Sequence, residues 1–364
     1  MVKTCSGCHS SEKIMAQFGL AINPVNSYLD SYHGVAVRAG NLTAANCASC
    51  HRYHDVLAPS DANSSVNPAN LQKTCGSCHK KAGELVSKGK IHADLTQPQA
   101  QGSYEWVLDM VKKMYILLIV LTLGGMMLHN LVDLYRKGVS GWHSHPAELR
   151  MSVNERVQHV FLAVSFICLA YTGFGHRYPD SLFNTIFFAG TSGAALRTLL
   201  HRVFGGLFIA LAFYHAVWLV GLKEGRKCLM ELLPGLNDIR DFFQLQKFNI
   251  FHKGQPPKFR HFSYMEKVEY WALVWGSFVM VLTGCVVWFR EWSLQVLPKW
   301  IIDLALLIHF MEAILACLAI LVWHSYWTVF DPAVYPMNWA WLTGKVAPPR
   351  LAGQEESHEE EDKD

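Results

Sequence analysis

Apolar residues gather in five stretches of the chain, while the first hundred residues are mainly polar. The five stretches are residues 114–132, 157–175, 203–222, 270–289 and 301–330. Each is close to or above the roughly 20 residues that a helix needs to cross a bilayer. Lipid offers no partner to unpaired backbone groups, so segments of this kind span as helices. The pattern predicts an all-α membrane protein with five transmembrane helices and a loop-rich N-terminal domain.

Positive charge in the loops sets the expected orientation. Loops 135–156 and 223–267 carry 13 Lys and Arg residues, whereas loops 176–202 and 290–300 carry 5. Short cytoplasmic loops of membrane proteins hold the excess of Lys and Arg. We therefore expect a protein of the bacterial cytoplasmic (inner) membrane, with a periplasmic N-terminal domain and a cytoplasmic C-terminus.

The same boundaries give the expected domains. Residues 1–103 form the external domain, 104–134 an extra first transmembrane helix, 155–330 a four-helix bundle and 331–364 a cytoplasmic tail. The acidic end of that tail, 354–364, predicts a solvated, disordered segment.

The composition supports a location in a lipid bilayer and excludes several classes of function. Charged residues make up 17% of the 364 residues, against about 25% in an average soluble domain. The formal net charge of +3 is too small to predict a nucleic-acid partner. The sequence has no phosphate-binding loop, nucleophile triad, or flavin or molybdenum motif. Histidine is the unusual residue, with 18 copies.

Six of the ten cysteines lie in three C-x-x-C-H units. The units are Cys5, Cys8 and His9; Cys47, Cys50 and His51; and Cys75, Cys78 and His79. In such a unit the two cysteines form thioethers to one porphyrin, and the histidine binds its iron. The other four cysteines are scattered singly, which excludes a disulfide scaffold. The units predict three haems c.

Each of these irons needs a sixth ligand. His33, His54 and His92 are the histidines of this domain outside the units, and they predict three bis-histidine haems. His54 follows His51 by only three residues, so we expect it to reach a neighbouring haem. The pairing of the other two stays open.

These features resemble the small multihaem c-type cytochromes of the triheme and tetrahaem class over roughly residues 1–95, and the segment from Ser64 to His79 is similar to exported multihaem proteins. Bacterial c-type haem is attached outside the cytoplasmic membrane, in agreement with the orientation above. Nothing before Cys5 resembles a signal peptide, so we expect a longer precursor, with further haem units.

Histidines also lie within the apolar stretches, where an ionisable residue predicts function. His309 and His324 are 15 residues apart, which is about 22 Å of helix rise and about 60° of rotation. His201 and His215 are 14 apart and also share a face. Two imidazoles per helix, one in each leaflet, predict two stacked haems b. His201 and His309 form the outer pair, and His324 takes either His159 or His215 at the inner haem.

The residues around these histidines resemble a known family. Glu-Arg-Val-Gln-His-Val-Phe-Leu, Leu-Leu-His-Arg-Val-Phe-Gly-Gly and Leu-Leu-Ile-His-Phe-Met are similar to helices of the dihaem cytochrome b subunits of formate dehydrogenase and of prokaryotic cytochrome b561, over about 155–345. That resemblance implies His159 and His324 at the inner haem. The spacing of His201 and His215 is instead similar to cytochrome b of quinol–cytochrome c reductases, where His215 would replace His159.

The expected activity is electron transfer between quinone, with menaquinol as the expected form, and periplasmic or membrane redox partners. Glu312, His215 and His129 are candidate quinone or proton residues, Glu312 because it lies one turn from His309. The expectation is a quinol:cytochrome c-type oxidoreductase within a larger complex. An anchor subunit that passes electrons from a dehydrogenase or reductase to quinone is the alternative, and a haem-based sensor is a more distant one.

Overall fold

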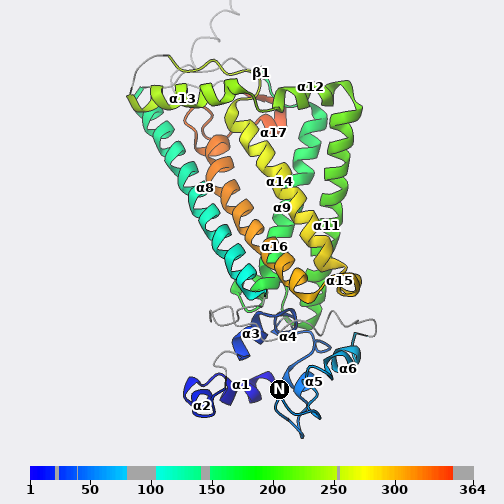
Figure 1. Ribbon diagram of the computed structural model, residues 1–364. Helices are drawn as coiled ribbons and strands as arrows, with labels where there is room; N and C mark the ends of the chain where they lie inside the picture. Colours follow the sequence, from blue (N-terminus) through cyan, green and yellow to red (C-terminus); the bar gives the residue numbers. More distant parts are fainter. Residues whose placement is uncertain (21–23, 39, 80–103, 141–147, 252–254, 347–364) are drawn as a thin grey trace, which may run out of the picture. The chain divides into compact units, whose positions relative to one another are not determined.

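The computed structural model describes residues 1–20, 24–38, 40–79, 104–140, 148–251 and 255–346. Within these residues the chain is helical, apart from a two-stranded antiparallel ladder of β1 (Glu148–Leu149) and β2 (Lys345–Val346). Five helices are long and apolar enough to cross a membrane (Figure 1). The prediction of an all-α membrane protein with five candidate spans is confirmed.

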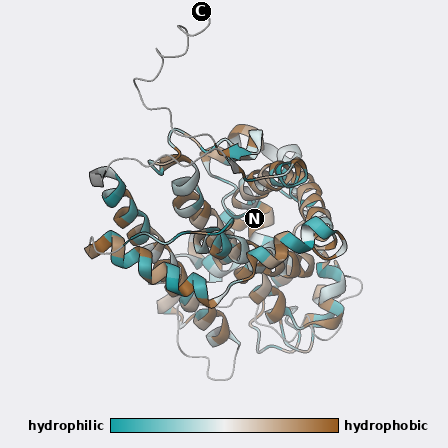
Figure 2. Ribbon diagram, turned by 90° about the horizontal axis from the view of Figure 1, so that it is seen from above, coloured by the Kyte–Doolittle hydropathy of each residue, from teal (hydrophilic) through white to brown (hydrophobic). Residues whose placement is uncertain are grey.

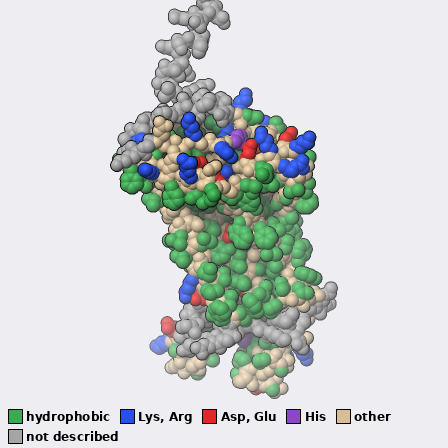
Figure 3. Space-filling model, turned by 45° about the horizontal axis from the view of Figure 1, so that its top comes forward, with side chains coloured by type: hydrophobic (Ala, Val, Ile, Leu, Met, Phe, Trp, Pro, Cys, Tyr) green, Lys and Arg blue, Asp and Glu red, His purple; other side chains and the backbone are tan. Residues whose placement is uncertain are grey.

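The candidate spans lie in five long helical segments. These are α8 (Glu105–Ser140), α9 (Val153–Arg177), α11 (Gly190–Gly221), α14 (Tyr264–Trp288), and α16 (Lys299–Ala319) with its π-helical continuations η1 (Ile320–His324) and η2 (Tyr326–Phe330). Their most hydrophobic 18-residue windows are only 11–17% buried. Figure 3 shows hydrophobic side chains covering the helix surfaces. Apolar faces that are left open in this way require lipid around them.

The starts of α9 and α14 are built alike. The backbone N–H of Ser152 donates to Glu155 at 2.7 Å, and that of Ser263 donates to Glu266 at 2.8 Å. In each case a serine is followed three residues later by a glutamate, which is the spacing of a helix-capping box. Both helices therefore begin directly after a serine that is followed, three residues later, by a capping glutamate.

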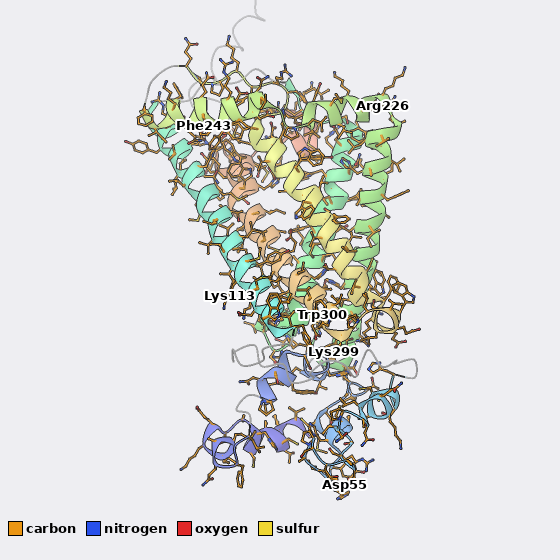
Figure 4. The ribbon with its side chains drawn as sticks, viewed as in Figure 1. Asp55, Lys113, Arg226, Phe243, Lys299 and Trp300 are labelled. Carbon is orange, nitrogen blue, oxygen red and sulfur yellow. The ribbon has the colours of Figure 1, made fainter. Side chains whose placement is uncertain are left out.

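The chain divides into two compact units. The first contains Met1–Ile116, Ser165–Leu207 and Phe278–Ala313. Its shorter helices are α1 (Val2–His9), α2 (Glu12–Gln17), α3 (Pro24–Asp30), α4 (Tyr32–Arg38), α5 (Cys47–His51), α6 (Leu71–Gly76), α10 (Leu182–Phe187) and α15 (Arg290–Val296). At the start of α16, Trp300 stacks on Tyr104 with ring centroids 6.1 Å apart (Figure 4).

The N-terminal part of this unit has very little apolar core. Among the described residues of 1–79, the buried hydrophobic side chains are Met15 and Tyr28. Local hydrogen bonds stabilise the ends of its short helices. At α5, the Asn46 side chain accepts from the backbone N–H of Ala48 at 3.0 Å and caps the helix. A domain of this size with so few buried apolar side chains needs another source of stability.

The second unit contains Leu117–Val164, Phe208–Ser277 and Ile314–Asp364. Its additional helices are α12 (Lys223–Leu232), α13 (Leu236–Phe251) and α17 (Ala340–Thr343). In α12 and α13, Arg226 and Phe243 are both exposed (Figure 4). Figure 2, a view from above, shows hydrophilic and hydrophobic residues interspersed along the helical ribbons.

Candidate functional site

His201 on α11 and His309 on α16 face each other in the first unit. Their ring centroids are 6.5 Å apart and their planes make an angle of 70°. The Nδ1 atom of His201 lies 2.8 Å from the Thr172 hydroxyl on α9, and that of His309 lies 3.0 Å from the Thr283 hydroxyl on α14. Each imidazole is therefore oriented by a threonine of a neighbouring helix.

The hydrogen bonds of these threonines fix the tautomers. The hydroxyl of Thr172 donates to the backbone carbonyl of Cys168 at 2.6 Å, and that of Thr283 donates to the carbonyl of Val279 at 2.6 Å. A hydroxyl has one proton to donate, so each threonine oxygen accepts the Nδ1–H of its histidine. The Nε2 atoms are then left unprotonated, which is the state of an imidazole that binds a metal.

A glycine follows each threonine and makes room for the ring. A Cβ atom added at Gly173 would lie 3.4 Å from Cε1 of His201, and one added at Gly284 would lie 3.2 Å from Cε1 of His309. The two Thr-Gly pairs thus form matching cradles for the two imidazoles.

His159 on α9 and His324 at the end of η1 form a second pair, in the second unit. Their ring centroids are 6.2 Å apart and their planes make an angle of 31°. The carboxylate of Glu269 on α14 accepts a hydrogen bond from Nδ1 of His324. Carboxylates that accept from the second nitrogen of an imidazole orient it and raise its basicity as a ligand.

His215 is engaged through both ring nitrogens. Its Nδ1 lies 2.7 Å from Oε1 of Gln158, which only accepts, and its Nε2 lies 2.9 Å from the Tyr270 hydroxyl. Nδ1 is therefore the donor, and the lone pair of Nε2 accepts from the tyrosine. The structure places His159, and not His215, opposite His324.

A third histidine pair lies in the N-terminal region. The rings of His33 and His79 have centroids 6.1 Å apart and planes at 37°. Burial lowers the pKa of His33 to about 4, and the nearby charges of His79, Arg290 and Lys299 add to this effect. The imidazole of His33 is therefore neutral, and able to bind a metal, at neutral pH.

Cysteines of the three C-x-x-C-H units lie close to one another. Burial raises the pKa of Cys47, and Cys5 adds to the increase. Burial likewise raises the pKa of Cys50, with contributions from Cys75 and Cys78. The first C-x-x-C-H unit thus lies beside the second C-x-x-C-H unit, and the second lies beside the third. The ring of His54 packs on Tyr53 with centroids 4.6 Å apart, and His92 lies outside the described residues.

The common spacing of the three histidine pairs is the feature that fits a haem iron. An imidazole nitrogen binds a metal ion at about 2 Å, and that nitrogen lies about 1 Å from its ring centroid, so two imidazoles on one ion have centroids about 6 Å apart. The three observed values, 6.1, 6.2 and 6.5 Å, agree with this distance.

His129 on α8 has a different environment. Its Nε2 lies 2.7 Å from the hydroxyl of Tyr264, and its side chain is buried. The rings of Trp323, Trp327 and Phe242 surround it, with centroids 5.1, 5.8 and 6.4 Å away. His129 thus belongs to an aromatic cluster with one polar pair, and no second histidine ring is found beside it among the described residues.

Charged groups lead from this cluster along α8. Asp133, one turn after His129, accepts a hydrogen bond from the Tyr326 hydroxyl at 2.7 Å. Lys137, one turn further on, lies 2.8 Å from Asp133 and 2.7 Å from Asp331. Asp133 is buried, whereas Lys137 is about one-third exposed.

Glu312, one turn from His309, is also buried. Its carboxylate accepts a hydrogen bond from the Tyr115 hydroxyl at 3.1 Å. Because Tyr115 lies on α8, this helix supplies a polar partner to Glu312 as well as carrying His129.

The residues that support the histidines are not among those predicted from the sequence, although a repeat in the sequence marks them. Positions 111 residues apart correspond: Ser152 and Ser263, Glu155 and Glu266, Gln158 and Glu269, His159 and Tyr270, Thr172 and Thr283, Gly173 and Gly284. In the structure these residues occupy equivalent roles in α9 and α14. The repeat breaks at two adjacent places that matter chemically: Gln158 and His159 on α9 are replaced by Glu269 and Tyr270 on α14.

Histidine pairs that bridge apolar, membrane-length helices are the arrangement by which a membrane cytochrome b holds its haem. The chain belongs to the prokaryotic cytochrome b561 family, whose model matches residues 150–336. It is therefore a membrane cytochrome b involved in electron transfer, and the family implies haem b as a cofactor. A search of curated proteins found no match to the chain. The N-terminal region and α8 lie outside the matched residues.

Proposed function

We propose that this protein transfers electrons between the quinone pool and periplasmic redox partners through two haems b and three haems c. The observation that carries the proposal is the common spacing of three histidine pairs, at 6.1–6.5 Å between ring centroids. Haem supplies reversible one-electron transfer when it is bound. The protein residues set the ligands, the orientation of those ligands and the path of protons.

His201 and His309 hold one haem b, and His159 and His324 hold the other. The threonine hydroxyls and the Glu269 carboxylate orient three of these imidazoles through Nδ1. His215 is a supporting residue, because its hydrogen bonds to Gln158 and Tyr270 occupy both ring nitrogens.

In the N-terminal domain the six unit cysteines form the thioethers, and His9, His51 and His79 bind iron on one side. The contact between His33 and His79 supports His33 as the sixth ligand at the third unit. His54 and His92 remain the proposed sixth ligands of the other two haems. The scarcity of buried apolar side chains in this domain supports porphyrins as its core.

The aromatic cluster around His129 is the proposed quinone site, with menaquinone as the expected form. Aromatic walls suit a quinone ring, and the hydrogen-bonded pair of His129 and Tyr264 suits a carbonyl or hydroxyl oxygen. Asp133 and Lys137 then connect the site to the end of α8 and offer a proton route. Glu312 with Tyr115 is the second candidate for proton transfer, since a buried carboxyl in a membrane helix is costly without a function.

The proposed location is the bacterial cytoplasmic membrane, with the haem c domain in the periplasm and the C-terminus in the cytoplasm. The excess of Lys and Arg in loops 135–156 and 223–267 supports this orientation. Membership of a larger complex is part of the proposal, and an anchor subunit that delivers electrons to quinone is the alternative function.

Two measurements test the proposal. A pyridine haemochrome spectrum, referred to chain concentration, is expected to show three haems c and two haems b, and a protein without haem b would overturn it. The purified protein is then mixed with reduced quinol and an external cytochrome c. Reduction of the cytochrome without other subunits supports the proposed activity, whereas activity only after a partner is added supports the anchor subunit.

A further inference from the structure

Arg197 is a buried cation that has no carboxylate partner among the residues that the structure describes. It lies on α11, one turn before His201, and only 1% of its surface is exposed. One of its terminal nitrogens, Nη1, donates to Oδ1 of Asn184 at 2.6 Å, while Nε is buried without a hydrogen-bond partner. None of the ion pairs found among the described residues includes Arg197.

This arrangement is unfavourable for the protein alone. A guanidinium stays charged in proteins, and a buried charge requires a partner of opposite sign to offset its lost hydration. Asn184 is neutral, and its amide is already used, because Nδ2 donates to the carbonyl of Pro179 at 2.7 Å. Asn184 therefore orients the guanidinium without neutralising it, and the site calls for an anion that the described residues do not supply.

The position of Arg197 indicates which anion this is. A Cβ atom at Gly175 would lie 2.9 Å from Cδ of Arg197, so the absence of a side chain on Gly175 lets the arginine pack across α9. The next residue, His176, has its ring centroid 5.4 Å from that of His201. Arg197 and the iron ligand His201 thus share one site.

We propose that Arg197 binds a propionate carboxylate of the haem held by His201 and His309, with Asn184 fixing the direction of its guanidinium. Haem b carries two carboxylates on one edge of its ring, and the arginine fork matches a carboxylate with two parallel, charge-assisted hydrogen bonds. This inference rests on the proposed function insofar as the His201–His309 pair holds haem b.

The interaction has an electrochemical consequence. Reduction of the haem removes one positive charge from it, so a nearby cation favours the reduced form. Replacing the arginine by a neutral residue also leaves a propionate uncompensated, which favours the oxidised form. Both effects lower the midpoint potential of this haem, while the haem of the His159–His324 pair keeps its value.

The test compares Arg197→Gln and Arg197→Lys with the wild type in the full chain, purified in detergent. The matched control is Arg202→Gln, an exposed arginine on the same helix. Optical redox titration follows the two haems b, and resonance Raman spectroscopy follows the propionate bending band. We expect the potential of one haem b to fall in Arg197→Gln, to fall less in Arg197→Lys, and to stay unchanged in the control, with a shifted propionate band in both Arg197 variants.

Unchanged potentials and an unchanged propionate band in Arg197→Gln, with both haems b present, would overturn the inference and leave the proposed function intact. If Arg197→Gln loses one haem b, the test passes to Arg197→Lys. A shifted propionate band in that variant supports the inference, and an unchanged band overturns it. A wild-type protein without haem b would overturn the proposed function itself, and this inference with it.

Discussion

Tyr270 occupies in α14 the position that His159 occupies in α9. Each follows a residue, Glu269 or Gln158, whose side chain holds Nδ1 of a histidine on the next long helical segment. The consequences differ, because the Tyr270 hydroxyl hydrogen-bonds to Nε2 of His215 at 2.9 Å, whereas His159 faces His324 as a second imidazole. One half of the repeat therefore completes a pair of facing imidazoles, and the other half occupies Nε2 of His215 with a tyrosine hydroxyl.

Removing His159 and removing His215 are expected to have different effects on haem content. His159→Ala loses one of the two haems b, because His324 is left without its opposing imidazole. His215→Ala keeps both, since its ring is already bonded to Gln158 and Tyr270. The pyridine haemochrome ratio of b to c measures this. The reverse result, with His215→Ala losing a haem and His159→Ala keeping both, would contradict our assignment.

Glu269 is expected to lower the potential of the haem bound by His324. Its carboxylate increases the basicity of the imidazole and so stabilises ferric iron. We predict that Glu269→Gln raises the midpoint potential of one haem b in an optical redox titration. Gln158→Ala is the matched control at the equivalent repeat position, and it leaves both potentials near their wild-type values. A shift of equal size in the control would point to a general structural effect.

The two threonines are expected to tune the other haem b in the same direction. Thr172→Val and Thr283→Val each remove an acceptor from Nδ1 of His201 or His309. A lost hydrogen bond of about 1 kcal/mol that favours the ferric state corresponds to a rise on the order of 40 mV. The double variant should show about twice the shift of either one, because the two ligands act on the same iron. Redox titration at constant pH measures this, and a fall in potential would refute the tautomer assignment.

His33→Met tests the sixth ligand at the third C-x-x-C-H unit. Methionine in place of histidine raises the potential of a haem c, so one of the three haems c is expected to titrate at a higher potential. The thioethers through Cys75 and Cys78 keep that haem attached, and mass spectrometry of the denatured chain confirms that all three remain. If all three potentials are unchanged, His33 is not an iron ligand.

His129→Phe is expected to slow the reduction of haem b by quinol, by roughly 100-fold if the imidazole transfers the quinol proton. Phenylalanine retains an aromatic ring among Trp323, Trp327 and Phe242, so the packing of the cluster is largely kept. Stopped-flow reduction measures the rate, and chemical reduction by dithionite checks that the haems are intact. Glu312→Gln is compared in parallel: an unchanged rate there excludes Glu312 as a proton relay, and an unchanged rate in His129→Phe excludes His129.

The sequence by itself determined the elements of the fold, because each depends on nearby residues. Apolar runs long enough to span a bilayer predicted five helices, and the structure confirms them. The C-x-x-C-H units likewise place two thiols and an imidazole within five residues, so haem attachment is predicted without knowledge of the fold. The prokaryotic cytochrome b561 family, which the sequence resembled around its membrane histidines, matches residues 150–336.

Only the tertiary structure decided which distant residues meet. His159 and His215 are both plausible partners of His324 along the sequence, and the choice depends on how Gln158 and Tyr270 engage the ring of His215. The sequence likewise does not show that Arg197 is buried without a carboxylate partner among the described residues. An arginine close to a loop is ordinarily expected to be exposed. Ligand choice and charge burial depend on packing between helices, and local sequence patterns carry no record of that packing.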